Sequence, residues 1–201
     1  MQFIKRFHLL VMPILFLCLS SVLFSFETLK MEEYQVKSIF LYKLCCFTTW
    51  PEETTWDPAR PLVISVLGTL PPGGQIQLVG KKKIGKRRLE IKYIQDIKEI
   101  ERSDVLFIAS SEKNRIDKIL EYVAKKPILT VGDTPGFGHR GVIVNMFIKD
   151  KNMGYEINPS ALKKADLILN TYFFQNGIIV NTATSAHLGH MAGGNVGETS
   201  I

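Results

Sequence analysis

The residues best suited to chemistry lie in one glycine-rich segment, which runs from Val131 to Gly138 and reads VGDTPGFG. Its Asp133 could accept hydrogen bonds from loop amides or act as a general base, with His139 as the nearest histidine. No nucleophile stands in an elbow motif here, so we assign no catalytic residue. The plain interpretation is an aspartate-capped turn. The functional alternative is contact with a ligand or partner at the carboxyl end of a sheet, through Asp133, Pro135, Gly136 and Phe137.

A second glycine turn supplies the remaining candidate, Gly68. It follows the apolar run Leu62 to Leu67 and precedes a Pro-Pro-Gly-Gly turn. The glycine spacing does not fit a dinucleotide fingerprint, and a phosphate-binding Gly-Lys-Ser/Thr is absent from the chain. A tight turn is the simplest interpretation, and we expect no cofactor. Because both glycine loops follow strands, they could lie side by side and form a small-ligand pocket.

Histidines and cysteines do not predict a metal site. His187 and His190 lie near the end of the chain without a third ligand nearby. Cys45 and Cys46 are neighbours on a predicted helix, where side chains point about 100° apart and are badly placed to bridge each other. We interpret them as small apolar residues at a helix end, with a vicinal disulfide or a redox pair as the alternatives.

The N-terminus resembles an export signal. Lys5 and Arg6 precede an uncharged run from Leu9 to Phe26. We predict a cleaved signal peptide over residues 1–26 and export from the cytoplasm, with a retained membrane anchor as the alternative. The formal net charge is +6, but export argues against nucleic-acid partners. A basic cluster over residues 81–88 is interpreted as a solvated loop, or as a contact with headgroups or an acidic partner.

The elements that must position these residues alternate between helix and strand. A helix is predicted over residues 31–47 from the spacing of Val36, Ile39, Phe40, Leu44 and Phe47, with Glu32, Glu33 and Lys37 elsewhere on it. Alternation of apolar and polar residues predicts a strand near the sheet edge over 89–94, and apolar runs predict strands within 104–109 and 127–131. Ser110, Ser111 and Glu112 offer caps for a helix over 113–124.

The end of the predicted domain differs in pattern. Residues 142–148 and 155–158 suggest a hairpin, and the apolar set from Ala161 to Leu169 suggests a helix with a proline just inside its start. We predict an α/β fold: a three-layer, Rossmann-like, mostly parallel sheet with helices on both faces and a C-terminal antiparallel hairpin. The domain is expected over residues 31–180, followed by a flexible tail over residues 181–201.

Several motifs, in order, resemble the YfiR family of periplasmic proteins. Residues 36–42 and 47–51 are similar to that family's opening VKAAFLYNFxxFxxWP. The strand ISVLG, a Gly-Lys-Arg step at 85–87, the strand VLFI and the segment PILTVGD with PGF follow in the family's order. YEIN at 155–158 stands where the family has FEIN, and the helix through residues 167–169 corresponds to its final helix. The resemblance covers residues 34 to about 180.

The chain also departs from that pattern. Ser103 stands where a cysteine is common, so the resemblance implies that the family's disulfides are missing here. Arg140 to Ile143 replace a glycine pair with methionine, and Leu169 to Phe174 replace the LSSQLL of the final helix.

What the resemblance implies is a non-enzymatic periplasmic regulator. Its expected partner is the periplasmic domain of an inner-membrane diguanylate cyclase or kinase, with an effect on cyclic di-GMP and biofilm. A homodimer is left open. A periplasmic small-ligand sensor is the second hypothesis, and an enzyme that uses Asp133 with His139 is the third.

Overall fold

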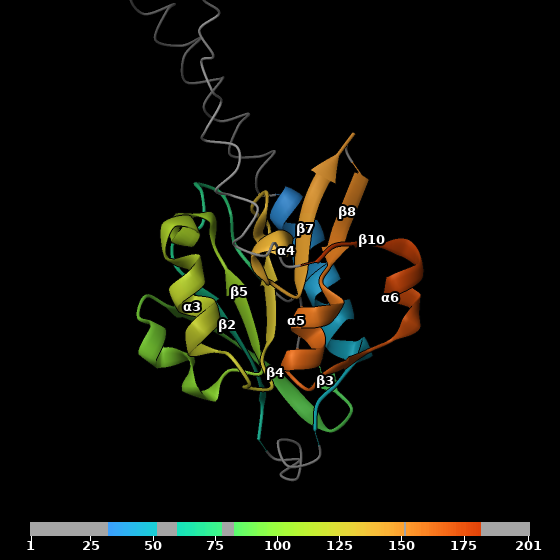
Figure 1. Cartoon of the computed structure of the whole chain (residues 1–201). Coiled ribbons are helices and arrows are strands. Elements are labelled where there is room, and N and C mark those ends of the chain that lie inside the picture. Colours follow the sequence, from blue (N-terminus) through green and yellow to red (C-terminus); the bar gives the residue numbers. More distant parts are fainter. Residues whose placement is uncertain (1–31, 52–59, 78–82, 151, 182–201) are drawn as a thin grey trace, which may run out of the picture.

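Eight strands form one sheet in the order β10-β8-β7-β6-β5-β2-β4-β3 (Figure 1). The computed structural model describes residues 32–51, 60–77, 83–150 and 152–181. The predicted signal peptide, most of the predicted tail, His187 and His190 lie outside these residues.

The centre of the sheet is built from the apolar runs of the sequence. β2 (Leu62–Leu67), β5 (Val105–Ile108) and β6 (Leu129–Gly132) are parallel and buried throughout. β4 (Arg87–Ile94) lies parallel to β2 on its other side, and β3 (Lys83–Ile84) turns back antiparallel to β4 at the edge. Continuous apolar character suits strands covered on both faces.

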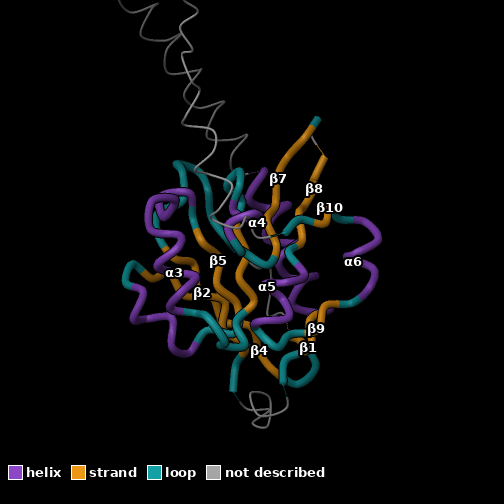
Figure 2. The backbone as a smooth tube through the Cα atoms, viewed as in Figure 1, coloured by secondary structure: helices purple, strands orange, loops and turns teal. Residues whose placement is uncertain are grey.

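The predicted hairpin closes the opposite side of the sheet. β7 (Val144–Lys149) is parallel to β6, β8 (Asn152–Ile157) is antiparallel to β7, and β10 (Ile178–Ile179) forms the edge beside β8. A separate pair of short strands, β1 (Thr48–Thr49) and β9 (Ile168–Leu169), lies side by side in Figure 2. The mostly parallel sheet with its antiparallel hairpin confirms the predicted fold class.

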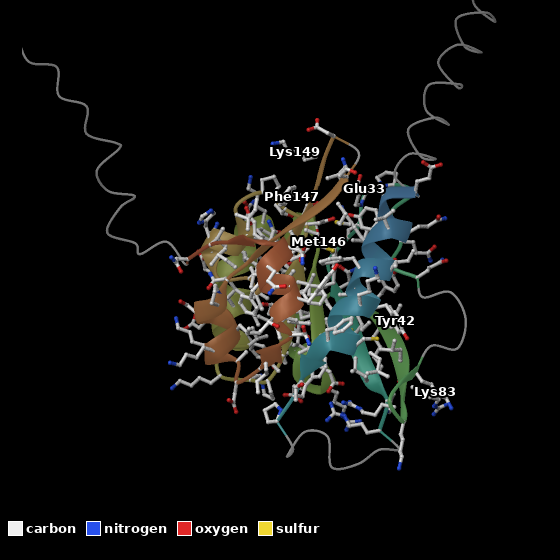
Figure 3. The ribbon with its side chains drawn as sticks, turned by 90° about the vertical axis from the view of Figure 1, so that its right-hand side faces the viewer. Glu33, Tyr42, Lys83, Met146, Phe147 and Lys149 are labelled. Atoms are coloured by element: carbon white, nitrogen blue, oxygen red, sulfur yellow. The ribbon has the colours of Figure 1, made fainter. Side chains whose placement is uncertain are left out.

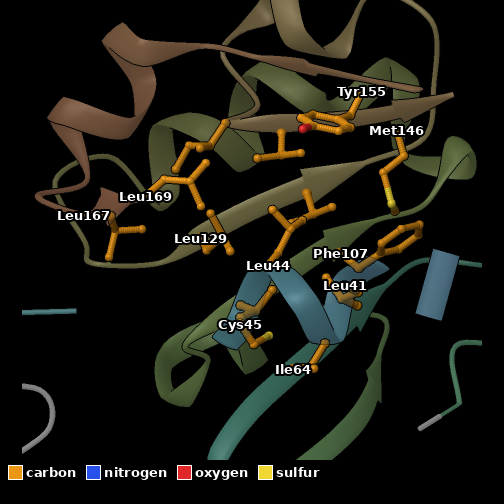
Figure 4. Close-up of a cluster of buried hydrophobic side chains, with 14 of the residues drawn as sticks. Leu41, Leu44, Cys45, Ile64, Phe107, Leu129, Met146, Tyr155, Leu167 and Leu169 are labelled. Carbon is orange, nitrogen blue, oxygen red and sulfur yellow. The ribbon is translucent and has the colours of Figure 1, made fainter. Parts of the chain in front are cut away.

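Helices cover the two faces of the sheet. The helix over residues 32–47 covers one face, where its Leu41 and Leu44 pack with side chains of the sheet such as Ile64, Phe107 and Leu129 (Figure 4). We call this set of buried side chains the first hydrophobic cluster. The second cluster lies between the sheet and the elements η1 (Ile97–Arg102), α3 (Ile116–Tyr122) and α4 (Phe137–Arg140). α5 (Pro159–Lys164) follows β8 on the α3 side, and α6 (Thr171–Asn176) precedes β10 (Figure 1). Among the described helices, none is long and apolar enough to span a bilayer.

The N-terminal helix buries a different face from the one that the apolar spacing suggested. Phe40 and Leu44 do face the core, but Val36, Ile39 and Phe47 are exposed. The buried stripe instead runs through residues 34, 37, 38, 41, 44 and 45 at spacings of three and four, and it includes Lys37. The interpretation of the cysteine pair holds for Cys45, which is buried and free, but not for Cys46, which is exposed and free.

Two predicted helices have different limits. The serines at 110 and 111 lie inside a 3₁₀ helix, η2 (Ser110–Arg115), rather than capping an α-helix, and the α-helical part ends at Tyr122. The helix predicted to reach Leu169 ends at Lys164. Asp166 then adopts a left-handed conformation with φ of 54°, which no helix can continue through, and the chain enters β9.

One cation of the basic cluster belongs to the interior, which corrects its interpretation as solvated loop. Arg87 is buried, and its Nη2 lies 3.0 Å from Oδ2 of Asp104. The same carboxylate accepts the backbone N–H of Val63, while Arg87 also donates to two carbonyls of the loop before β2. This network ties the starts of β2, β4 and β5 together.

Candidate functional site

The two predicted glycine loops lie at the same edge of the sheet, with β5 between them. The strand register pairs Leu67 with Ile108 and Ile108 with Gly132, so Gly68 and Asp133 stand in one row at the carboxyl ends. Two strand spacings separate them, roughly 10 Å.

Gly68 is enclosed by protein. With φ of 89° it adopts a conformation that favours glycine, and a Cβ there would lie 2.5 Å from Oγ of Ser111. That hydroxyl accepts the backbone N–H of Thr69, and the buried Glu112 lies beside it. The first glycine loop is therefore filled by η2.

Asp133 is the centre of a buried ionic cluster. Its Oδ2 accepts the hydroxyl of Tyr34 at 2.9 Å and lies 2.6 Å from Nζ of Lys37. The side chains of Lys37 and Asp133 are only 4% and 5% exposed. Lys37 also pairs with Glu33 one helical turn away, and its ammonium lies 4.4 Å from the centre of the Tyr34 ring.

The cluster joins two distant parts of the chain and replaces the expected capped turn. Asp133 follows β6, whereas its partners come from the first helix, 96 and 99 residues away. Burial, followed by the nearby Asp133 carboxylate, holds the pKa of Tyr34 well above its usual range. Tyr34 therefore stays a hydrogen-bond donor to Asp133 at ordinary pH.

A cleft of about 530 Å³ opens beside this cluster. Asp133, Pro135 and Gly136 line it together with Glu33 and Lys37, and the β7–β8 hairpin and Ile178 of β10 contribute the remainder. Figure 3 shows Glu33 and Phe147 at the same end of the molecule. Three of the five predicted contact residues thus line one cleft. Gly68 does not line it, because η2 packs around that glycine, and Phe137 does not line it, because its ring is buried in the second hydrophobic cluster.

The wall formed by the hairpin carries polar groups that the sequence analysis missed. Asn145 donates from Nδ2 to Oε2 of Glu156 at 3.0 Å, while its buried Oδ1 has no hydrogen-bond partner within the described residues. Alternation along β7 and β8 could have indicated that Asn145 and Glu156 share a face, since they are directly paired across the hairpin.

Comparison with known proteins supplies the family. Residues 34–173 match the YfiR/HmsC-like family. The chain belongs to this family. The match confirms the resemblance drawn from the motifs, and it includes Tyr34, Lys37 and Asp133. No curated protein matches the sequence.

Solved structures are similar to this YfiR/HmsC-like chain only distantly. The ligand-free, open structure of CD0873, a substrate binding protein with adhesive properties from Clostridium difficile, has a TM-score of 0.42 and 11% identity over 66% of this chain and 59% of that chain. A conserved domain protein from Vibrio cholerae O1 biovar El Tor has a TM-score of 0.43 and 12% identity over 60% of this chain and 54% of that chain. The chain therefore spans less than two thirds of the length of either protein.

Within the described part of the YfiR/HmsC-like chain, Asp133 is not joined to a histidine. Nδ1 of the exposed His139 lies 3.3 Å from the carbonyl oxygen of Asn181, whereas the Asp133 carboxylate contacts Lys37 and Tyr34. Among the described residues, no group of three or more histidine, cysteine or acidic side chains is placed to hold a metal ion.

An exposed apolar surface of the YfiR/HmsC-like domain lies where the first helix meets α6. Phe47, Ile168 and Tyr172 are 45%, 69% and 57% exposed. The rings of Phe47 and Tyr172 stack with their centres 6.5 Å apart, and Ile168 pairs with Thr49 across β1 and β9. We call these three residues the apolar ledge. Sequence periodicity alone missed it, because the residues come from segments about 120 positions apart.

Proposed function

We propose that this protein is a non-enzymatic periplasmic regulator that binds the periplasmic domain of an inner-membrane signalling protein. A diguanylate cyclase is the expected partner, so that binding lowers cyclic di-GMP and disfavours biofilm, with a membrane kinase as the alternative. Membership of the YfiR/HmsC-like family supports this role. The basic and apolar pattern of residues 1–26 supports export as a cleaved signal peptide, ahead of a domain over 31–180 and a tail over 181–201.

The observation that carries the proposal is the apolar ledge. Large apolar side chains exposed together are typical of protein–protein interfaces, and tyrosine is enriched among the residues that dominate binding energy. The ledge includes Tyr172 of α6, which lies in the segment that replaces the family's LSSQLL motif. The same surface could serve a homodimer.

Regulation requires only that the protein bind one state of its partner more tightly. If the protein binds the inactive state of its partner more tightly than the active state, binding shifts the partner's equilibrium toward the inactive state. The size of the shift equals the difference between the binding free energies of the two states. A hundredfold preference corresponds to about 2.7 kcal/mol, which lies within the usual range of coupling free energies.

A matched pair of isoleucines tests the ledge. The tagged exported protein is incubated with solubilised inner membranes, and the captured membrane proteins are identified. We expect Ile168→Ser to weaken capture by roughly tenfold or more, as for a central interface residue. Ile148→Ser, an exposed isoleucine on the hairpin at β7, should capture as the parent does. Equal loss in both variants, or in neither, would contradict the proposed surface.

A small-ligand sensor is the second candidate function, with contact through Asp133, Pro135 and Gly136. The observation that favours it is Oδ1 of Asn145, a buried acceptor in the cleft lining without a described partner. Buried acceptors are usually satisfied, so a ligand that donates a hydrogen bond would stabilise the folded protein. Phe137 and Gly68, also predicted as contacts, would act only by shaping the loops around the cleft.

Thermal shift in the presence of nucleotides and amino acids tests this candidate. A ligand at one hundred times its dissociation constant should add about 2.7 kcal/mol to the free energy of unfolding. Asn145→Leu, which removes the orphaned acceptor, should abolish the shift. If no compound raises the melting temperature of the parent protein, the sensor hypothesis fails while the regulator hypothesis stands.

A further inference from the structure

A second cleft, on the other side of the fold from the first helix, is chemically unlike the cleft beside Asp133. It has a volume of about 560 Å³ and lies between α3 and α5, which are neighbours in Figure 1. Its walls and floor are mainly apolar and include Leu120, Val123, Ile128, Ile143, Ala161 and Ala165. We call it the α3–α5 groove.

Small side chains keep the α3–α5 groove open. α5 presents Ala161 and its C-cap residue Ala165 to the groove. Gly141 ends α4 at the border of the groove with φ of 110°, a conformation that favours glycine. Larger residues on α5 would close the space between the two helices. The volume falls within the range of about 300–1,000 Å³ that is typical of small-molecule sites, which are also mostly apolar with a few polar groups.

The polar side chains at the groove are donors or cations. Lys125, Arg140 and Lys164 are exposed at its border, and none of the residues that line it in the described part of the chain is acidic. Arg140 already has a partner, since its Nε–H donates a hydrogen bond to Oδ1 of Asp117 at 2.9 Å. In the floor, Oγ1 of Thr130 accepts the N–H of Ile143 at 2.9 Å, which leaves the hydroxyl hydrogen available to donate.

From this combination we propose that the α3–α5 groove binds a single-chain anionic amphiphile. The acyl chain lies on the apolar floor between α3 and α5, and the carboxylate or phosphate head is held at the border by Lys125 and Lys164. Apolar burial supplies most of the affinity, and the lysines select the sign of the head group. The site is separate from the apolar ledge and from Asp133, so it does not rest on the proposed regulatory role.

The test uses the exported protein and dodecanoate below its micelle concentration, with binding followed by isothermal titration calorimetry. Dodecyl phosphate tests the second head-group chemistry. Dodecyltrimethylammonium carries the opposite charge on the same chain, and vesicles of phosphatidylglycerol present the anionic head in a bilayer. We expect saturable binding of dodecanoate or dodecyl phosphate at one site per chain, and at least tenfold weaker binding of dodecyltrimethylammonium.

Variants locate the site. Lys164→Gln should weaken dodecanoate binding about fivefold, the upper end for one exposed charge pair. Lys163→Gln is the matched control, since Lys163 is the exposed neighbour on α5 that does not line the groove. Ala161→Leu should fill the groove and abolish binding. If that variant does not fold, the double variant Lys125→Gln and Lys164→Gln tests the site instead. We expect it to bind dodecanoate about 25-fold more weakly than the parent protein does.

Four results would overturn the proposal. They are no binding of either anionic probe, equal binding of the cationic amphiphile, vesicle binding without binding of the monomeric probes, and unchanged binding by Ala161→Leu. A change of oligomeric state in Ala161→Leu without a change in dodecanoate binding would assign the groove to contact between two copies of the chain instead.

Discussion

Removal of Lys37 should destabilise the protein far more than removal of a typical helix lysine. Its ammonium lies 2.6 Å from Oδ2 of Asp133, and both side chains are almost fully buried. Lys37→Met keeps the approximate length of the side chain but leaves the Asp133 carboxylate with the hydroxyl of Tyr34 as its one side-chain partner among the described residues. Breaking a buried ion pair from one side costs about 3–5 kcal/mol, so we expect a loss of about 4 kcal/mol.

The partner substitution should cost less. In Asp133→Asn, Lys37 keeps Glu33 as a counter-ion, and the asparagine oxygen still accepts from Tyr34. We expect a loss of about 2 kcal/mol, the range for a hydrogen bond to a charged group. The double variant should lose about 4 kcal/mol rather than about 6, because the second substitution removes a charge that the first left unpaired. The coupling energy is then about 2 kcal/mol.

Urea unfolding of the parent, the two single variants and the double variant measures this cycle. For a chain of this size, each kcal/mol also lowers the melting temperature by about 2–4 °C. Lys43→Met is the control, because Lys43 is exposed on the same helix and should change stability by less than about 0.5 kcal/mol. Additive losses in the double variant, or a Lys37→Met loss no larger than that of the control, would refute the reasoning.

Three further predictions concern Asp104, Tyr34 and the cysteine pair. Asp104→Asn should destabilise by about 3 kcal/mol in urea unfolding, because it leaves the buried Arg87 without its counter-charge; a loss under 1 kcal/mol would contradict this. Stability should fall as pH rises above about 10, since the raised pKa of Tyr34 makes the folded state bind that proton more tightly, and Tyr34→Phe should fall less steeply over pH 9–11. Iodoacetamide should modify Cys46 but not the buried Cys45, whose pKa burial also raises; mass spectrometry of the native protein checks this, and equal labelling would refute the described burial.

The elements that sequence analysis predicted best are those defined by local pattern. β2, β5 and β6 are continuous apolar runs, and they became the buried centre of the parallel sheet. α5 begins where Asn158 and Pro159 indicate, with the Asn158 side chain accepting the N–H of Ala161. These features depend on residues within one or two turns of each other.

The features that sequence analysis missed depend on contacts between distant segments. Lys37 looked like a solvent-facing residue because it is charged, yet its position on the buried stripe and the carboxylate of Asp133 place it inside. Arg87 is likewise buried by Asp104, 17 positions away. Ile168 lies in a strand rather than in the predicted helix, because it pairs with Thr49 of β1. In each case the conformation depends on a residue that is distant in the sequence, and the local sequence pattern does not identify that residue.

The part of the candidate site that lies at the carboxyl end of a strand could be predicted from the sequence. Asp133, Pro135 and Gly136 line one cleft, as the position after β6 suggested. The packing of η2 around Gly68 and the burial of Phe137 could not be read from glycine and proline spacing. Both follow from how helices fill the carboxyl edge of the sheet.

Purification of the endogenous complex tests the regulatory role most directly. The tagged protein is expressed at native level, crosslinked in intact cells, and recovered with its bound membrane proteins. The account predicts capture of an inner-membrane protein with a periplasmic domain and a cyclase or kinase domain, with Tyr172→Ser reducing that capture while Ile148→Ser does not. Recovery of no membrane protein, or undiminished capture by Tyr172→Ser, would contradict it.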